Sequence, residues 1–194
     1  MTVLPRAFYA RPTLDVARDL IGKILVHVVR GQRTSGVIVE TEAYIGESDP
    51  ACHAARGRTP RNLPLYGPPG HAYVYFNYGM HHLANAVTEA EGVPAAVLIR
   101  ALEPLENEGA MRRRRGRDGV GLHDLFRGPG NLTVALGVTL AQNRADLTRG
   151  SLVIEDHGLR RDVAWTPRIG IRVGTEHRWR CVATGSRAVS GRRV

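Results

Sequence analysis

Hydrophobic and polar positions alternate in several short stretches of the chain, which is the pattern of β-strands with one buried face. Residues 23–29 and 35–44 alternate on either side of a polar turn (30–34), and they predict a first hairpin. Residues 71–78 and 81–88 predict a second hairpin that turns near Gly79. Further strands are predicted over 95–104, 151–156, 168–174 and 179–185.

Three stretches instead have helical character. Residues 13–21 predict a short helix, with Thr13 as its N-cap and Gly22 as its stop. Residues 104–116 predict another helix, because acids come early and arginines late, which suits the helix dipole. Asn131 follows a Gly-Pro turn and is predicted to cap a third, short helix.

Strands outnumber helices, and most are linked as hairpins. We therefore predict an α+β fold, a single domain over residues 1–194 around a largely antiparallel sheet. Residues 46–70 are dense in Gly and Pro and predict a loop of about 25 residues. Loops of that length are usually functional or disordered.

Composition narrows the setting of the protein. No stretch of 18 apolar residues occurs, so no membrane contact is expected. The start lacks the layout of a secretory signal, and two cysteines cannot build a disulfide framework. We expect a cytoplasmic protein, associated with the nucleoid in a bacterium or nuclear in a eukaryote.

The charge points to a partner. The chain has 27 Lys and Arg against 18 Asp and Glu, a net charge of +9. Only Lys23 is a lysine, so arginine, whose planar fork suits phosphate oxygens, dominates. A GC-rich coding bias could explain the choice of arginine, but not the surplus of positive charge. Nucleic acid is the predicted partner.

The strand "VIVETEAYIG" carries candidate catalytic groups. Alternation puts Val37 and Val39 on one face, and Glu40, Glu42 and Tyr44 on the other. Two carboxylates about 7 Å apart, at a strand end that leads into a long loop, could form the rim of an active site. The alternative is a solvated edge on which both glutamates pair with arginines.

The remaining polar motifs mainly argue against a metal site and a nucleotide cofactor. Cys52 and the four histidines between 53 and 82 lack the spacing of a zinc site, so no metal is expected. No phosphate-binding or dinucleotide motif occurs, so no nucleotide cofactor is expected. The arginine run within 111–119 predicts a mobile loop or a frayed helix end in solvent.

The second hairpin, "YVYFNYGMHH", holds three of the six tyrosines. Alternation puts Tyr73 and Tyr75 on one face, and Val74 and Phe76 on the other face as core. Tyr78 precedes the turn, where an exposed aromatic ring of a basic protein could enter a nucleic-acid stack.

Five ordered motifs carry a resemblance. "GVIVETEAYIG", "ACHAARGRTPRN", "YVYFNYGMHHLAN", "LIRALEPLE" and "GPGNL" occur in this order between about residue 13 and about residue 190. Together they resemble the alkyladenine (3-methyladenine) DNA glycosylase family. The resemblance implies a monomer with a curved, open-barrel-like sheet, flanking helices and a β-hairpin that protrudes toward double-stranded DNA.

The resemblance also implies an activity. Members of this family flip damaged purines out of duplex DNA and hydrolyse the N-glycosidic bond with water. Glu42 matches the general base, and Arg100 matches the partner of the water and of the flipped nucleotide's backbone. Tyr78 matches the wedge that fills the gap in the base stack.

The walls of the base pocket follow from the same motifs. Tyr44, His53 and Tyr75 match the side chains that sandwich the flipped base. Asn85 matches the residue that discriminates against the amino group of guanine. One departure is Arg187, which stands where the family commonly has a proline.

The reaction expected on these grounds is hydrolysis without strand cleavage. A lyase step needs an amine nucleophile, and the only side-chain amine, Lys23, begins a predicted core strand. Two other readings remain open: a non-catalytic nucleic-acid-binding module and a hydrolase of free nucleosides. The preference among 3-methyladenine, 7-methylguanine, hypoxanthine and ethenoadenine is also open.

Overall fold

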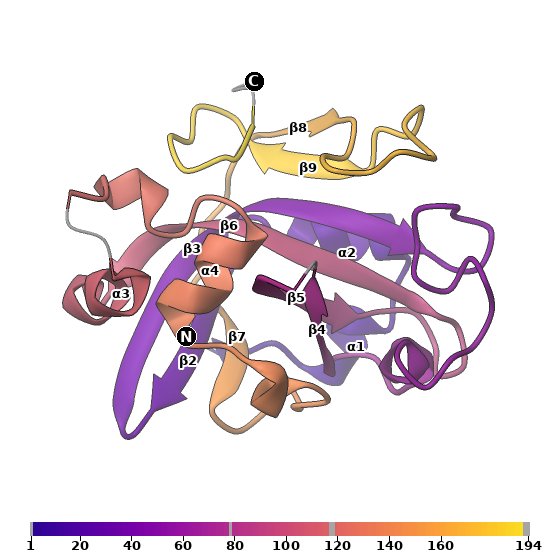
Figure 1. Cartoon of the computed structure of the whole chain (residues 1–194), viewed down its shortest axis with the longest axis horizontal. Coiled ribbons are helices and arrows are strands. Elements are labelled where there is room, and N and C mark those ends of the chain that lie inside the picture. The colour runs from indigo at the N-terminus through magenta and orange to yellow at the C-terminus, as the bar shows by residue number, and fades with distance from the viewer. Residues whose placement is uncertain (1, 78, 117–118, 192–194) are drawn as a thin grey trace.

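The computed structural model describes residues 2–77, 79–116 and 119–191 (Figure 1). Its strands are β1 (Thr2–Val3), β2 (Ile24–Val29), β3 (Gln32–Ile45), β4 (Ala72–Asn77), β5 (His81–Val87), β6 (Ala95–Glu106), β7 (Leu152–Asp156), β8 (Val163–Thr166) and β9 (Arg180–Ala183). Its helices are α1 (Arg6–Tyr9), α2 (Thr13–Asp19), α3 (Glu108–Arg115) and α4 (Pro129–Leu136), with single 3₁₀ turns η1 (Leu63–Tyr66), η2 (Leu122–Asp124) and η3 (Leu140–Gln142).

All strands join one antiparallel sheet in the order β1-β7-β2-β3-β6-β5-β4, and β9 pairs with both β3 and β8. The sheet is not closed, so the predicted α+β class with a largely antiparallel, open sheet is confirmed. In Figure 1, β3 and β6 cross the centre, α2 lies behind them, and α4 lies in front. The main core fills the space between this sheet and the helices, where Val16 of α2 and Leu132 of α4 are fully buried.

The long strand β3 changes partners along its length. Its first half pairs with β2, and Glu40 to Glu42 pair with β9. Between these halves the register with β6 shifts twice, which leaves Val39 on β3 and Arg100 on β6 without an opposite residue. Such bulges bend a strand and re-aim side chains. The predicted alternation is therefore wrong at Val39: it packs in the main core, whereas Val37 belongs to a separate cluster.

Both predicted hairpins form. β2 and β3 turn through Arg30 and Gly31, which both have positive φ, as the tight two-residue hairpin turn requires. This turn is shorter than the predicted one, because β3 already starts at Gln32. The hairpin of β4 and β5 forms one edge of the sheet, where β5 pairs with β6 (Figure 1). Tyr78, the predicted DNA wedge, falls outside the described residues.

Two predicted helix caps are wrong. Helix α2 begins at Thr13 itself, after Pro12, and the Thr13 hydroxyl bonds to Thr88 and Glu89 instead of capping. Helix α4 is preceded by Gly128, and the Asn131 side chain donates to the Arg127 carbonyl. Thr13 is thus used by a tertiary contact, whereas Asn131 is used by a local bond to the residue four positions before it.

The C-terminal strand assignments need revision. Residues 168–174 form an irregular segment and no strand, whereas residues 163–166 form β8, which the pattern did not predict. The predicted helix over 104–116 begins only at Glu108, because β6 continues to Glu106. Phe76 is 44% exposed, so its predicted place in the core is wrong, whereas Val74 is buried as predicted.

The arginine run is also not a solvated loop over its described part. Arg112 to Arg115 lie in α3, which Asn107 caps by accepting from the Ala110 N–H. Arg114 donates to the Ala135 carbonyl at 3.0 Å, and Arg115 donates to the carbonyls of residues 124 and 125. These guanidiniums hold neighbouring segments together, which a count of like charges could not foresee.

Candidate active site

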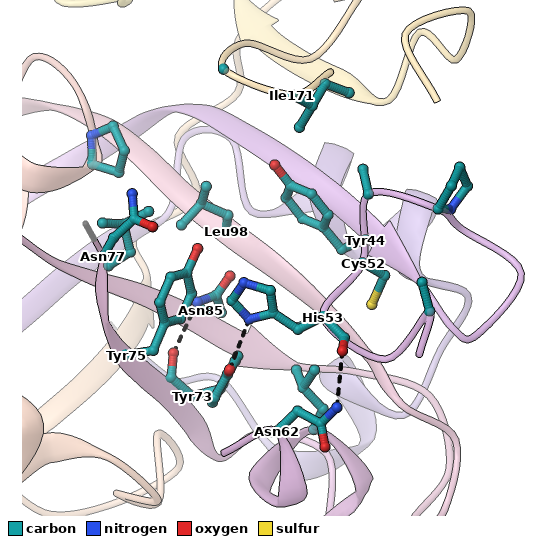
Figure 2. Close-up of a pocket in the computed structure, with 18 of the residues that line it drawn as sticks. Tyr44, Cys52, His53, Asn62, Tyr73, Tyr75, Asn77, Asn85, Leu98 and Ile171 are labelled. Atoms are coloured by element: carbon teal, nitrogen blue, oxygen red, sulfur yellow. Dashed lines mark hydrogen bonds between the residues drawn. The ribbon is translucent and has the colours of Figure 1, made fainter. Parts of the chain in front are cut away.

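A cavity of about 710 Å³ opens between the β4–β5 hairpin, the 46–70 loop, the β3–β6 pair and the irregular segment after residue 168 (Figure 2). Its lining includes Tyr44, His53, Tyr75, Asn85 and Arg100, five of the predicted site residues. They come from five segments of the chain: β3, the 46–70 loop, β4, β5 and β6. The structure therefore brings together the residues that the motifs proposed singly.

Aromatic rings line one part of the cavity (Figure 2). The rings of His53 and Tyr75 meet edge to face, with centroids 4.5 Å apart. Tyr73 packs 5.2 Å from Tyr75, and its hydroxyl lies 2.9 Å from His53 Nδ1. Tyr44 adds a further ring from the end of β3. Aromatic faces at such a site favour a flat, electron-poor ligand.

These rings are uncharged near neutral pH. Withdrawal from water lowers the pKa of His53, and the nearby Arg61 cation lowers it further. Burial raises the pKa of Tyr44 far above its ordinary value, and the charge of Glu42 adds to the shift. Burial likewise raises the pKa of Tyr73 to about 12. A neutral His53 does not repel a cationic ligand.

Arg100 connects the cavity to two buried carboxylates. Its bulged position on β6 turns the side chain toward β3, where Nε donates to Glu40 at 2.9 Å and Nη1 donates to Glu42 at 3.1 Å. Burial alone would lower the pKa of Arg100, but Glu42 and Glu40 raise it, so the guanidinium stays charged. Both glutamates are 0% exposed, so this strand is not a solvated edge, although both glutamates pair with arginines as that alternative expected.

The two glutamates have different acceptor capacity left. A carboxylate offers about four lone-pair sites. Glu40 accepts four hydrogen bonds: three on Oε1, from Arg100, Arg180 and the Ser190 hydroxyl, and one on Oε2, from the Ser190 N–H. Glu42 accepts from the Tyr44 hydroxyl, Arg100 and the Ile169 N–H, which leaves one site on Oε1. Glu42 therefore accepts fewer hydrogen bonds than Glu40, and its Oε1, which has one bond, can accept a further proton donor.

Glu42 itself is not among the residues that line the cavity; Tyr44 and Arg100, which bond to it, stand at the cavity surface. Its Oε1 is bonded to the N–H of Ile169, which belongs to the lining segment 169–173. That segment was predicted as a strand and not as part of the site. No sequence motif indicated that this segment belongs to the site, because an irregular segment joins a site only through tertiary contacts.

A buried ion pair holds this segment in place. Arg168 and Asp49, both 0% exposed in their side chains, form two bonds of 2.6 and 2.8 Å. The Arg168 guanidinium also lies over the rings of Tyr44 and Trp179, at 4.8 and 5.0 Å. The pair thus joins the start of the long loop, a wall of the cavity and the C-terminal segment.

Asn85 lies opposite Tyr73 on the hairpin, and its side-chain amide donates to the Tyr73 carbonyl at 2.9 Å. This bond fixes the amide at the cavity wall. The rim of the cavity carries the guanidiniums of Arg56, Arg61 and Arg172. A polyanion is therefore favoured at the mouth of the cavity.

Among the described residues, no group of three or more His, Cys, Asp or Glu side chains is arranged to hold a metal ion. None of the helices in that part of the chain has the length and apolarity to span a membrane. The sheet, the aromatic cavity and the adjoining Glu42–Arg100 pair define a site that can bind a flat ring and orient a water molecule against it.

The chain belongs to the methylpurine-DNA glycosylase (MPG) family, whose model matches residues 7–187, and it is a DNA glycosylase of DNA repair. Similar chains carry the name "Putative 3-methyladenine DNA glycosylase". One from Methanocella arvoryzae is 49% identical over 99% of this chain and 98% of its own length. Others are from Burkholderia lata, 48% identical over 97% and 91%, and from Chlorobium phaeobacteroides, 47% identical over 100% and 98%.

Proposed function

We propose that this DNA glycosylase excises alkylated purines, 3-methyladenine and 7-methylguanine, from double-stranded DNA, with deaminated or etheno purines as further substrates. The damaged nucleotide is flipped into the cavity, and an activated water hydrolyses the N-glycosidic bond. The observation that carries the proposal is the buried Glu42–Arg100 pair, joined at 3.1 Å, beside an aromatic cavity.

The cavity suits a purine made cationic by alkylation. Such a base is already a good leaving group, so its departure needs no protonation. Tyr44, Tyr75 and the neutral ring of His53 form the walls between which the base stacks, and electron-rich ring faces attract the cation. Asn85, fixed by its bond to Tyr73, discriminates against the exocyclic amino group of guanine.

Glu42 is the general base. Its remaining acceptor site can take a proton from water, a role worth roughly 10²- to 10⁴-fold in rate. Arg100 has five N–H donors, and three of them are used by Glu40, Glu42 and Ser190. The other two can donate to the water and to the backbone of the flipped nucleotide.

The enzyme is monofunctional in this proposal. A lyase step would need an amine in the cavity. Lys23 does not line the cavity, and its Nζ is bonded to Asp156 at the end of β7, at 2.7 Å. Borohydride should therefore trap no covalent complex with damaged DNA. A trapped complex that survives in a Lys23→Arg variant would show another amine at work.

The protein acts as a monomer on DNA in this proposal, and Tyr78 is the wedge that replaces the flipped base. A Tyr78→Ala variant should lose more activity on a paired lesion than on a mismatched one, since a mismatched base costs less to flip. Equal losses on both substrates would contradict the wedge. Binding should weaken steeply with salt, as phosphate contacts require.

The decisive experiment compares Glu42→Gln with Glu106→Gln, a control on the same sheet that pairs with Arg33. Release of free base from methylated duplex DNA should fall at least 100-fold in Glu42→Gln at unchanged DNA affinity. The control should retain activity. Equal release by Glu42→Gln would refute the general base, and binding without release by the wild type would favour a non-catalytic module.

Activity of the wild type on free nucleosides would favour the third reading, a nucleoside hydrolase. The arginines at the rim argue against it, because a free nucleoside offers no phosphate for Arg56, Arg61 or Arg172.

A further inference from the structure

The C-terminal segment of the described chain contacts Arg100 and Glu40 through Ser190. Ser190 is 7% exposed and lies among charged groups rather than at a free end. Its N–H donates to Glu40 Oε2 at 2.6 Å, and its hydroxyl donates to Glu40 Oε1 at 2.8 Å. The same hydroxyl accepts from Arg100 Nη2 at 3.3 Å. One serine thus bridges Glu40 and Arg100.

A second arginine completes this arrangement. Arg180 of β9 lies opposite Glu42 in the register with β3, and its Nε donates to Glu40 at 2.7 Å. Its Nη2 donates to the Ser190 carbonyl at 2.7 Å. Glu40 and Glu42 are balanced by Arg100 and Arg180, so the buried cluster is neutral as a whole. Buried charges persist when they are paired and hydrogen-bonded in this way.

Arg100 needs such support because of its place in the sheet. It is the bulged residue of β6, without an opposite residue on β3, so the ladder alone does not fix the direction of its side chain. Nε, Nη1 and Nη2 are each held by a different partner: Glu40, Glu42 and Ser190. These contacts leave two N–H groups free toward the cavity.

We propose that Ser190, acting with Glu40 and Arg180, is a positioning residue of the glycosylase, through which the C-terminal segment locks Arg100 in its working orientation. Ser190 touches neither the cavity nor the proposed base directly. The inference rests on the function proposed for Glu42 and Arg100. It adds that the active site is complete only when residues 188–190 are docked beneath it.

The test uses a serine from the same segment as its control. Ser190→Ala removes the hydroxyl bridge but keeps the backbone bond to Glu40, whereas Ser190→Thr keeps a hydroxyl. Ser186→Ala removes the bond of the Ser186 hydroxyl to Glu103 at 2.7 Å and the bond that it accepts from the Ala188 N–H at 3.3 Å, but it removes no bond to Arg100 or Glu40. Each variant is measured for single-turnover release of the base, for affinity to damaged DNA, and for melting temperature.

Ser190→Ala should lower the single-turnover rate roughly 10-fold or more, the effect of one bond to a charged group, with DNA affinity within a factor of about two. Ser190→Thr should recover most of the rate, and Ser186→Ala should match the wild type. The proposal is overturned if Ser190→Ala keeps the wild-type rate, or if both alanine variants lose activity in proportion to their melting temperatures.

A readout without catalysis separates this proposal from the proposed function. The Arg100 Nε–H signal in a ¹⁵N spectrum, identified by its loss in Arg100→Lys, should be protected from solvent exchange in the wild type. It should exchange faster in Ser190→Ala but not in Ser186→Ala. Unchanged exchange in Ser190→Ala refutes the positioning role even if the wild type shows no glycosylase activity, and faster exchange supports it in either case.

Discussion

The buried ion pair between Arg168 and Asp49 offers a sharp test of how the cavity is built. The perturbation is Asp49→Asn, which keeps the size of the side chain but removes its charge. In the native protein both oxygens of Asp49 accept from Arg168, and they also accept from the backbone N–H groups of Ile45 and Ala51. An asparagine has one acceptor oxygen and one NH₂ group. One Arg168 N–H would therefore face the asparagine NH₂, and that hydrogen bond is lost.

The expected loss follows from the burial of the pair. Removing one charge of a buried pair costs about 3–5 kcal/mol, since the other charge stays behind unpaired. Arg168 keeps the carbonyls of Ala43 and Gly174 and the ring faces of Tyr44 and Trp179, so we expect the lower end, about 3 kcal/mol. For a chain of this size, that corresponds to a fall in melting temperature of about 6–12 °C.

Urea unfolding gives the free energy, and Asp15→Asn is the matched control. Asp15 pairs with Arg18 at 3.3 Å while both side chains are about half exposed, so its loss should cost less than about 1 kcal/mol. Asp49→Asn should also slow base release, because Arg168 precedes Ile169, whose N–H holds Glu42. A loss no larger than that of the control would refute the view that this pair holds the segment in place.

Three further outcomes are expected. Tyr73→Phe removes the hydroxyl that holds His53, so base release should fall several-fold while the free energy of unfolding changes by no more than about 1.5 kcal/mol; a wild-type rate would contradict this. Gly130→Ala should lower the free energy of unfolding in urea by about 1–3 kcal/mol, because the new Cβ would lie 2.7 Å from His81 Cγ. A higher free energy of unfolding would show that the His81 side chain can move aside at little cost. Burial lowers the pKa of His27 below the value of about 6.5 that it has in the unfolded chain. The stability that neutral His27 contributes is therefore complete above about pH 6.5 and is lost as the pH falls through the lowered folded value. The free energy of unfolding should fall less between about pH 7.5 and 5 in His27→Gln than in the wild type.

Local pattern was sufficient for much of the fold. The hairpins β2–β3 and β4–β5, the strand β6 and the antiparallel class follow from alternation and turn residues, because a strand with one buried face needs that period. The motifs also named five residues that meet in one cavity, including Tyr75 and Arg100. Their chemical roles stay predictions until the variants are measured.

Local pattern failed wherever a distant partner decided the outcome. Arg114 and Arg115 of α3 were predicted to lie in solvent, but they donate to backbone carbonyls of Ala135 and Leu125 in other segments. Thr13 was predicted as a cap, but its hydroxyl bonds to Thr88, 75 residues away. Phe76 fits the core by alternation, yet it is exposed near the end of β4, whereas Val74, two residues earlier on the same strand, is buried.

The sequence by itself determined the elements, the basic character and the motifs that match the methylpurine-DNA glycosylase family. Only the tertiary structure decided which glutamate accepts more hydrogen bonds. Glu40 and Glu42 are two positions apart on one strand, and nothing local separates them. Arg180 and Ser190, which supply three of the four bonds to Glu40, come from 140 and 150 residues further along the chain, whereas Glu42 accepts three bonds in all. The difference arises from long-range hydrogen bonds, which only the fold creates.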